Sequence, residues 1–452
     1  MENTNEYYLK EAPIKKAVKH LSIPMMLGLS IGTIYNVINA YFIGLLRNTD
    51  MLSAVTLGLP IFIVLMAIGN MFGVGGGTFI TRLIAKDEID KAKNIASYVI
   101  YSSFIFSIIV AVLAIIFINP ITSLLGASGS VFEVTKKYII ACLVLGFMVV
   151  INFALEQIVR CTGASKESMY GMAISAIVNL ILDPLLILVF HFDLVGAAVA
   201  MSVANLASAI YYAYYLQRKS EKLRNFFRIR KISFKDKIEI YKIGVPELIQ
   251  MSFMLVTTLL LNNFCMEYGD SVTASIGIAL RIVQVPEFLS MGIVLGVIPL
   301  LAYNYSSENF KRFNLGLKSG FKYIALISVF FFIVVFMLRK EVVGLFTSSN
   351  EVIRIGTYIL TAMLVSQLFN GIAGLFLGIF QASGKGTPTT IIAIAQGVLS
   401  IPVIIIGHSF FGLDGVIWST TVTELITFVL GSVMFLIVFN PFKSKKICNE
   451  VA

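Results

Sequence analysis

Charged residues are scarce in this chain. Asp, Glu, Lys and Arg make up 13% of its 452 residues, about half of the share found in soluble proteins. Hydrophobic residues make up 58%, which leaves too little polar surface to cover a water-soluble fold of this length. The composition therefore indicates a polytopic membrane protein.

Cysteine and histidine are also rare, which leaves little material for a metal centre or a nucleophilic active site. The four cysteines have no paired spacing, and three of them lie in or beside apolar runs, so we expect these three to be reduced and to pack within the protein. The three histidines lie near the ends of apolar runs, and no two of them have metal-ligand spacing. The glycine-rich residues 73–77 lack the Lys-Ser/Thr of a phosphate loop, so ATP is not expected to drive any activity. We therefore expect no enzyme, no catalytic residue and no cofactor.

Twelve apolar runs are long enough to cross a bilayer as helices, which takes about 17 residues or more. They cover roughly residues 17–45, 52–84, 92–118, 134–160, 167–190 and 194–217, and then 237–266, 272–304, 309–337, 353–381, 387–407 and 411–440. We expect an all-α polytopic membrane protein. The polar first 20 residues do not have the short apolar core of a cleavable signal peptide.

The positive charges follow the predicted topology. Most of the 35 Lys and Arg residues lie on one set of alternating connections, together with both termini. By the positive-inside rule these connections and termini face the cytoplasm. The net charge of +10 is thus explained by contact with a lipid bilayer, and nucleic-acid binding is not required.

A single long polar stretch divides the chain into halves that repeat each other. Ser22-Ile-Pro24 returns as Gly244-Val-Pro246, and Arg160-Cys-Thr-Gly163 returns as Gln381-Ala-Ser-Gly384. We expect an N-terminal lobe of six helices (1–217), a basic cytoplasmic linker (218–236) and a C-terminal lobe of six helices (237–452). Six helices in each half give both repeats one orientation, related by a pseudo-two-fold axis along the membrane normal. The substrate path of such transporters lies between the halves.

Asp183 is the most informative single residue. A carboxylate at the middle of a membrane helix costs about 2.5–3.5 kcal/mol to insert and by default marks a functional site. Asn179 lies one turn earlier on the same face, and Pro184 interrupts the helical hydrogen bonds at that turn. This turn would suit a proton or a small cation such as Na⁺. A structural Asp that is hydrogen-bonded within the bundle would give the same pattern.

Glu156 is the second candidate. The repeat aligns Asp183 and Glu156 with the apolar Val403 and Leu377, which favours a specialised task for both carboxylates. Arg160 follows Glu156 at i+4, the spacing of an ion pair on a helix surface. Alternatively, Glu156 faces a cavity, where desolvation favours the protonated carboxyl group and would make it a proton carrier.

Other polar residues within the predicted helices are candidates for the substrate cavity or for gating. The cavity candidates are Tyr35, Asn36, Asn152, Asn205 and its repeat counterpart Glu424; Asn36, Asn39 and Asn205 could equally form interhelical amide contacts. Arg281 and Glu287 flank Pro286. An internal Arg is rarely unpaired, so we expect Arg281 to pair with an acid in a structural or gating role.

Several of these motifs resemble one known family. Ile23-Pro24-Met25, Tyr41-Phe-Ile-Gly44, the glycine-rich residues 73–77 and Leu182-Asp183-Pro184 are similar to those of multidrug and toxic compound extrusion (MATE) transporters. The bacterial multidrug exporters near the DNA-damage-inducible branch are the most similar. The resemblance covers nearly the whole chain, and Leu-Asp-Pro is its most specific part.

The resemblance implies a V-shaped pair of six-helix lobes that exports small amphipathic, often cationic drugs in exchange for H⁺ or Na⁺. Many members carry an Asp where this chain has Asn39, and a small hydroxyl residue where it has Met201. Cation coupling is therefore assigned to Asp183, Glu156, Asn179 and Asn39, with Asp183 and Asn179 as the possible Na⁺ ligands and no other metal site. We expect a monomer in the plasma membrane.

Two alternatives need features that this chain provides poorly. A lipid-linked saccharide flippase of the same superfamily needs a cationic cleft for phosphate, and only Arg281 and Arg160 qualify. A membrane receptor or sensor needs a soluble domain, and none is visible in the sequence.

Overall fold

The computed structural model describes residues 4–44, 49–228 and 230–439, without the side chains of residues 35–37, 39–41, 43 and 44. All regular elements in this part of the chain are helices. Eleven helices or continuous helical runs are long and apolar enough to cross a bilayer, and a pair of helices bent by 49° makes up to twelve spans. The all-α membrane fold predicted from the sequence is confirmed.

The helices of the first half are α2 (Ile14–Gly44), α3 (Thr49–Ala85), α4 (Ile89–Ile116), the bent pair α6 (Ser130–Val144) and α7 (Gly146–Cys161), α8 (Ser165–Pro184) with the π-helical η1 (Leu185–Val189), and α9 (Asp193–Tyr214) with η2 (Tyr215–Lys219). Those of the second half are α10 (Phe234–Glu267), α11 (Asp270–Ser306), α12 (Phe310–Met337), α14 (Asn350–Ala382), α15 (Gly386–Gly397), α16 (Ser400–Phe411) and α17 (Leu413–Phe439). These bounds lie within a few residues of the apolar runs, because the length of such a run sets the length of a membrane helix.

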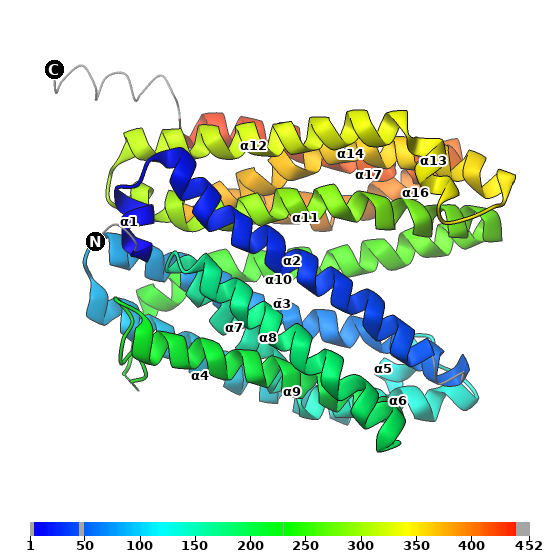
Figure 1. Ribbon diagram of the computed structural model, residues 1–452, viewed down its shortest axis with the longest axis horizontal. Coiled ribbons are helices and arrows are strands. Elements are labelled where there is room, and N and C mark those ends of the chain that lie inside the picture. The colour runs from blue at the N-terminus through cyan, green and yellow to red at the C-terminus, as the bar shows by residue number, and fades with distance from the viewer. Residues whose placement is uncertain (1–3, 45–48, 229, 440–452) are drawn as a thin grey trace.

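Three short helices were not predicted: α1 (Asn5–Lys10), α5 (Ile118–Leu124) and α13 (Arg339–Gly344). They are too short to produce a spanning apolar run. In Figure 1, α1 lies at one end of the molecule, whereas α5 and α13 lie toward the opposite end.

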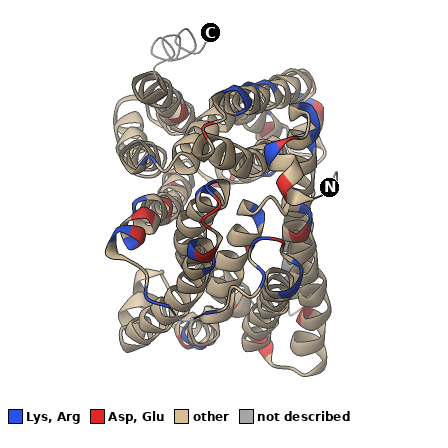
Figure 2. Ribbon diagram, turned by 90° about the vertical axis from the view of Figure 1, so that its left-hand side faces the viewer, with Lys and Arg blue, Asp and Glu red and all other residues tan. Residues whose placement is uncertain are grey.

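The helices form two bundles that are joined at one end. Figure 1 shows α3, α4, α7, α8 and α9 in one bundle and α11, α12, α14 and α17 in the other, while α2 and α10 run between the two. Helix α2 packs on α11 and on α8, and α10 packs on α3 and on α15, which lies in the second bundle. The end that carries α1 is called the joined end below. Figure 2 looks onto this end and shows Lys and Arg side by side with Asp and Glu on its loops and helix termini.

Two glycine crossings hold the bundles together. A Cβ at Gly75 of α3 would collide with the carbonyl oxygen of Ile240 in α10, and a Cβ at Gly296 of α11 would collide with Ser22 in α2. Gly75 and Gly296 are related by the offset of the sequence repeat. Small residues allow helix backbones to approach closely in membranes, so each half supplies one glycine to a pseudo-symmetric pair of contacts.

Helix α1 spans both bundles at the joined end. On one side, Asn5 donates to the Tyr215 hydroxyl (2.9 Å) and Glu6 pairs with Lys222 (3.0 Å). On the other side, the Arg312 guanidinium donates to the carbonyl oxygens of Tyr8 (2.9 Å), Leu9 (3.0 Å) and Ala12 (2.6 Å). Helix α1 and the residues that follow it therefore link the two sides of the contact between the bundles.

Candidate functional site

Asp183 and Asn179 are both buried at the end of α8. Their exposed fractions are 1% and 3%. Helix α8 ends at Pro184, and the chain continues in the wider π-helical geometry of η1. Since proline lacks an N–H, the regular ladder cannot continue through it, and single π-turns are frequent at functional sites. Tyr138 of α6 lies close enough for the charge of Asp183 to act on it.

Two of the predicted cavity residues contact each other. Asn152 of α7 donates to Asn205 Oδ1 of α9 (2.8 Å), and Asn205 donates to the carbonyl oxygen of Met201 (2.8 Å). Both side chains are buried. Asn205 thus makes an interhelical amide contact, which was one of its two alternatives.

Three further predictions fall on side chains that lie outside the described residues. Tyr35, Asn36 and Asn39 belong to the final turns of α2, but only their backbone is described. Their assignments to the cavity and to cation coupling stay predictions.

Glu156 pairs with Arg160, but inside the protein rather than on its surface. Glu156 Oε1 and Arg160 Nη1 are 3.9 Å apart, and the two side chains are 6% and 4% exposed. Arg160 also donates to Gln157, whose amide donates to Asn70 Oδ1 of α3 (2.6 Å). Asn70 in turn contacts Met251 Sδ of α10 (3.5 Å). The i,i+4 pair anticipated from the sequence is therefore part of a buried polar network that reaches α10, the first helix of the second half.

The same network contains two residues that sequence reasoning missed. Glu247 of α10 accepts a hydrogen bond from Gln381 of α14 (2.8 Å), and the charge of Arg160 acts on Glu247. The sequence did carry a signal. Gln381 is the repeat counterpart of Arg160, and Glu247 directly follows Pro246 within a predicted membrane helix, where a carboxylate is costly.

A second group of polar side chains lies within the other bundle. Glu424 of α17 is hydrogen-bonded to Gln396 of α15, and Glu287 of α11 lies close enough for its charge to act on Glu424. Gln250 of α10 donates to Gln396 Oε1 (2.7 Å). Pro286 lies inside α11, which continues past it as a helix.

The expected pairing of Arg281 with an acid is not found in the described part of the chain. Arg281 is exposed on α11, and it makes no ion pair with any acid among the residues that the structure describes. The sequence placed Arg281 within a membrane helix but could not tell which face of that helix carries it. An exposed Arg at this depth can extend its long side chain toward water without a counter-ion.

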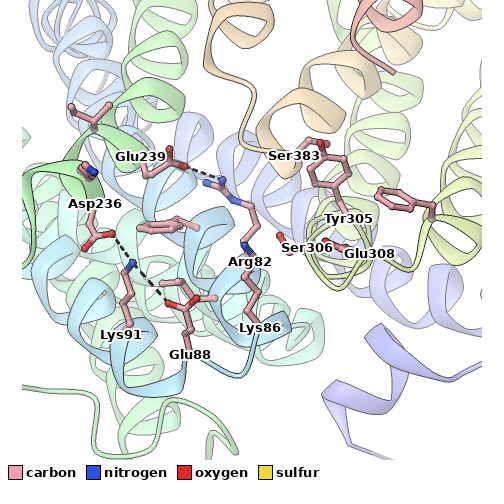
Figure 3. Close-up of a pocket in the computed structure, with 15 residues that line it drawn as sticks. Arg82, Lys86, Glu88, Lys91, Asp236, Glu239, Tyr305, Ser306, Glu308 and Ser383 are labelled. Carbon is pink, nitrogen blue, oxygen red and sulfur yellow. Dashed lines mark hydrogen bonds and ion pairs between the residues drawn. The ribbon is translucent and has the colours of Figure 1, made fainter. Parts of the chain in front are cut away.

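A pocket of about 640 Å³ lies at the joined end, away from the predicted site residues. Arg82 of α3 pairs with Glu239 of α10 (3.0 Å), and Lys91 of α4 pairs with Asp236 of α10 (2.9 Å) (Figure 3). The pocket wall is completed by Phe79, Leu83, Lys86, Glu88, Lys235, Ile238, Tyr305, Ser306, Glu308, Phe310 and Ser383. These ion pairs and the glycine crossings close the same end of the molecule.

The described residues contain no group of three or more His, Cys, Asp or Glu side chains that could hold a metal ion. Cys142, Cys161 and Cys265 are free and buried, in agreement with their predicted role as reduced packing residues.

Comparisons with known proteins give a consistent result. The MatE family model matches residues 24–185 and 246–406, one segment in each half of the chain. The chain is 40% identical over 424 residues to the multidrug export protein MepA of Staphylococcus aureus strain MRSA252, covering 94% of either protein. It is also 40% identical over 437 residues to MepA of Staphylococcus haemolyticus strain JCSC1435, covering 97% of this chain and 96% of that protein.

Solved structures share the fold at lower identity. A multidrug resistance MATE family transporter of the MOP superfamily in an outward-facing conformation matches with a TM-score of 0.87 and 23% identity, over 96% of this chain and 97% of that one. A MOP superfamily transporter from Pyrococcus furiosus matches with the same TM-score and identity, over 98% and 99%. The two-lobe arrangement of this chain is therefore the one seen in these transporters.

Proposed function

Since the chain belongs to the MatE family, we propose that it exports small amphipathic, often cationic compounds across a membrane in exchange for protons. Relatives that are 40% identical over nearly their whole length are named multidrug export proteins. The two bundles would take turns in opening the path between them to either side of the membrane.

The observation that carries this proposal is the burial of Asp183 and Asn179 beside the break between α8 and η1. A carboxylate at this depth is costly when charged and is retained where it binds an ion or a proton. Glu156 lies in the same bundle and is equally buried. These residues, with Asn39 of α2, would carry the coupling.

Coupling needs no direct contact between drug and proton. The deprotonated carboxylates would favour the state that accepts a drug from the cytoplasm or the inner leaflet. After the transporter opens outward, a proton bound at Asp183 would favour the state from which the drug is expelled. A ligand shifts a conformational equilibrium only through its different affinity for the two states, and this condition is sufficient here.

A proton suits the site better than Na⁺. Na⁺ requires several oxygen ligands in a defined geometry, whereas a proton requires only one carboxylate. The resemblance to MATE transporters implies an Asp in many members at the position where this chain has Asn39, so one carboxylate fewer is available here for a metal ion. Na⁺ held by Asp183 and Asn179 is the alternative that the experiment below separates.

The basic connections define the proposed orientation. The joined end, with α1, would face the cytoplasm, both termini would be cytoplasmic, and the protein would lie in the plasma membrane. We take residues 1–217 and 237–452 as the two lobes, with 218–236 as their linker, and a monomer as the working unit.

The test is dye efflux from proteoliposomes in which the pH gradient and the Na⁺ gradient are imposed separately. We expect a pH gradient alone to drive efflux by the native protein, and Asp183→Asn to reduce this efflux at least about tenfold. Asp193→Asn, at the exposed start of α9, is the matched control and should retain native efflux. Native efflux by Asp183→Asn would remove Asp183 from the mechanism, and efflux driven only by Na⁺ would refute proton coupling.

A further inference from the structure

Arg160 lies between two carboxylates from different halves of the chain. Glu156, on the same helix, is 3.9 Å from Arg160 Nη1, and Glu247 on α10 is within reach of the Arg160 charge. Arg160 and Glu156 are almost completely buried. Water therefore screens these charges little, and a buried guanidinium requires a counter-ion.

We propose that Glu156 and Glu247 compete for Arg160, and that this competition sets how firmly the two bundles are held at the joined end. A charge on Glu247 attracts Arg160 across the boundary between the bundles. A charge on Glu156 neutralises Arg160 within its own bundle and so weakens that attraction. Neutralising the two acids has opposite consequences: loss of charge on Glu247 loosens the joined end, and loss of charge on Glu156 tightens it.

The Arg160 guanidinium has one donor without a partner, which it could use when it moves from one acid to the other. Arg160 Nε is buried and has no hydrogen-bond partner among the described residues. An unsatisfied buried donor costs about 1–3 kcal/mol, so a small movement of Arg160 toward either acid is not opposed by loss of a bond at Nε. The ion pair with Glu156 is long at 3.9 Å, which is consistent with an Arg that is attracted by two acids.

The neutral neighbours position the competing groups without adding charge. Gln157 holds Arg160 and is itself bound to Asn70, while Gln381 donates to Glu247 Oε2 (2.8 Å). Gln381 occupies the position in the second repeat that Arg160 occupies in the first. Glu247 thus lies near both equivalent positions, but only the one in the first half carries a charge.

The other ionisable groups near Glu156 and Glu247 bond to partners other than these two acids. Tyr212 of α9 faces Glu156, but its hydroxyl donates to the carbonyl oxygen of Ser168 in α8 (2.7 Å). On the Glu247 helix, Glu239 and Lys242 pair with each other, and Glu239 also pairs with Arg82. In the described part of the chain, Arg160 is the one charged group that acts on Glu247.

The inference rests on the proposed function, because competition for Arg160 affects transport only if a proton that binds Glu156 or Glu247 is part of the export cycle. Its test does not require transport. Spin labels are attached at K86C, in the turn between α3 and α4, and at K235C, in the first turn of α10. Both positions line the joined-end pocket, and the native cysteines are removed first. The ratio of short to long label distances is measured in nanodiscs from pH 5 to pH 9.

The variants Glu247→Gln and Glu156→Gln keep the shape of each side chain and remove its charge. We expect Glu247→Gln to shift the ratio toward the long distance and Glu156→Gln to shift it toward the short distance. Each shift should be about fivefold or more, the lower end of usual coupling between sites. Glu133→Gln, an acid at the start of α6 that makes no contact with this network, should leave the ratio unchanged.

Competition for Arg160 requires that both shifts disappear when Arg160→Gln is added. Shifts of the same sign, a shift in only one variant, no shift in either, or shifts that persist without Arg160 would each overturn the proposal. If Arg160→Gln does not fold, the Glu156→Gln/Glu247→Gln double variant decides instead. Without a charge on Glu247 there is no attraction for Glu156 to weaken, so the double variant must match Glu247→Gln to within about twofold, and a ratio outside that range overturns the proposal. If the shifts appear but Asp183→Asn still exports normally, the proposed coupling at Asp183 falls while the competition for Arg160 stands.

Discussion

Replacing Arg312 with alanine should release the end of α1 from the bundle that contains α12. The Arg312 guanidinium donates to three carbonyl oxygens in the last turn of α1 and just beyond it, those of Tyr8, Leu9 and Ala12. Asn304 adds one more bond to Leu9 (2.9 Å). The contacts of α1 with the other bundle, through Asn5 and Glu6, do not involve Arg312.

The size of the effect follows from these bonds. A hydrogen bond to a charged group contributes about 1.5–3 kcal/mol. Arg312 is only partly buried and its three acceptors lie on one short segment, so we take about 3 kcal/mol for the set rather than the full sum. At 1.36 kcal/mol per decade, the docked fraction relative to the undocked one should fall about 150-fold.

Hydrogen exchange of the full-length protein in nanodiscs measures this change directly. The backbone amides of residues 8–12 should exchange about two orders of magnitude faster in Arg312→Ala than in the native protein. Arg339→Ala is the matched control, because Arg339 of α13 bonds to the Phe336 carbonyl in its own half, at the end of the molecule opposite α1. Native exchange rates at residues 8–12 would show that α1 is held by something other than Arg312, and they would refute the role of Arg312 in docking α1.

Two further predictions concern the joined end and the energetics of export. Gly75→Ala should prevent the close approach of α3 to Ile240 and reduce drug efflux below about a tenth of the native rate. Gly32→Ala is the control and should be tolerated, because a Cβ at Gly32 meets open space. Native efflux by Gly75→Ala would contradict the role of the crossing. Collapsing the membrane potential at a fixed pH gradient should slow export of a monovalent organic cation, as followed by fluorescence in proteoliposomes; an unchanged rate would rule out an exchange of two protons per cation.

The length of each membrane helix could be predicted from the sequence because one local property, apolar run length, determines it. The same holds for the Glu156–Arg160 pair, since i,i+4 neighbours on one helix meet whatever the fold. The burial of that pair could not be predicted. It depends on α3 and α10 passing nearby, and no local pattern in α7 specifies which helices do so.

The missed and mistaken residues have the same physical cause. Glu247 of α10 meets Gln381 of α14, which lies 134 residues further along the chain, and its relation to Arg160 depends on contact between the two halves. No acid pairs with Arg281 among the described residues, and the sequence could not show this because hydropathy places a residue along the membrane normal but not around the helix axis. Helix α1 is six residues long, and its stability comes from contacts with both bundles rather than from its own propensity.

The number of titrating carboxylates limits what the proposed exchange can use as a driving force. Exchange of one proton for one monovalent cation moves no net charge, so the membrane potential does not contribute. A potential of 100 mV is worth about 2.3 kcal/mol per charge, which is about fifty-fold in a concentration gradient.

Glu156, Arg160 and Glu247 together carry one net negative charge when both acids are ionised, so a single proton makes this group neutral. Asp183 can accept a second proton, and two protons for one cation would let the cycle draw on the potential. In that case, Arg160 limits the buried network to one proton and at the same time links that proton to the contact between the lobes.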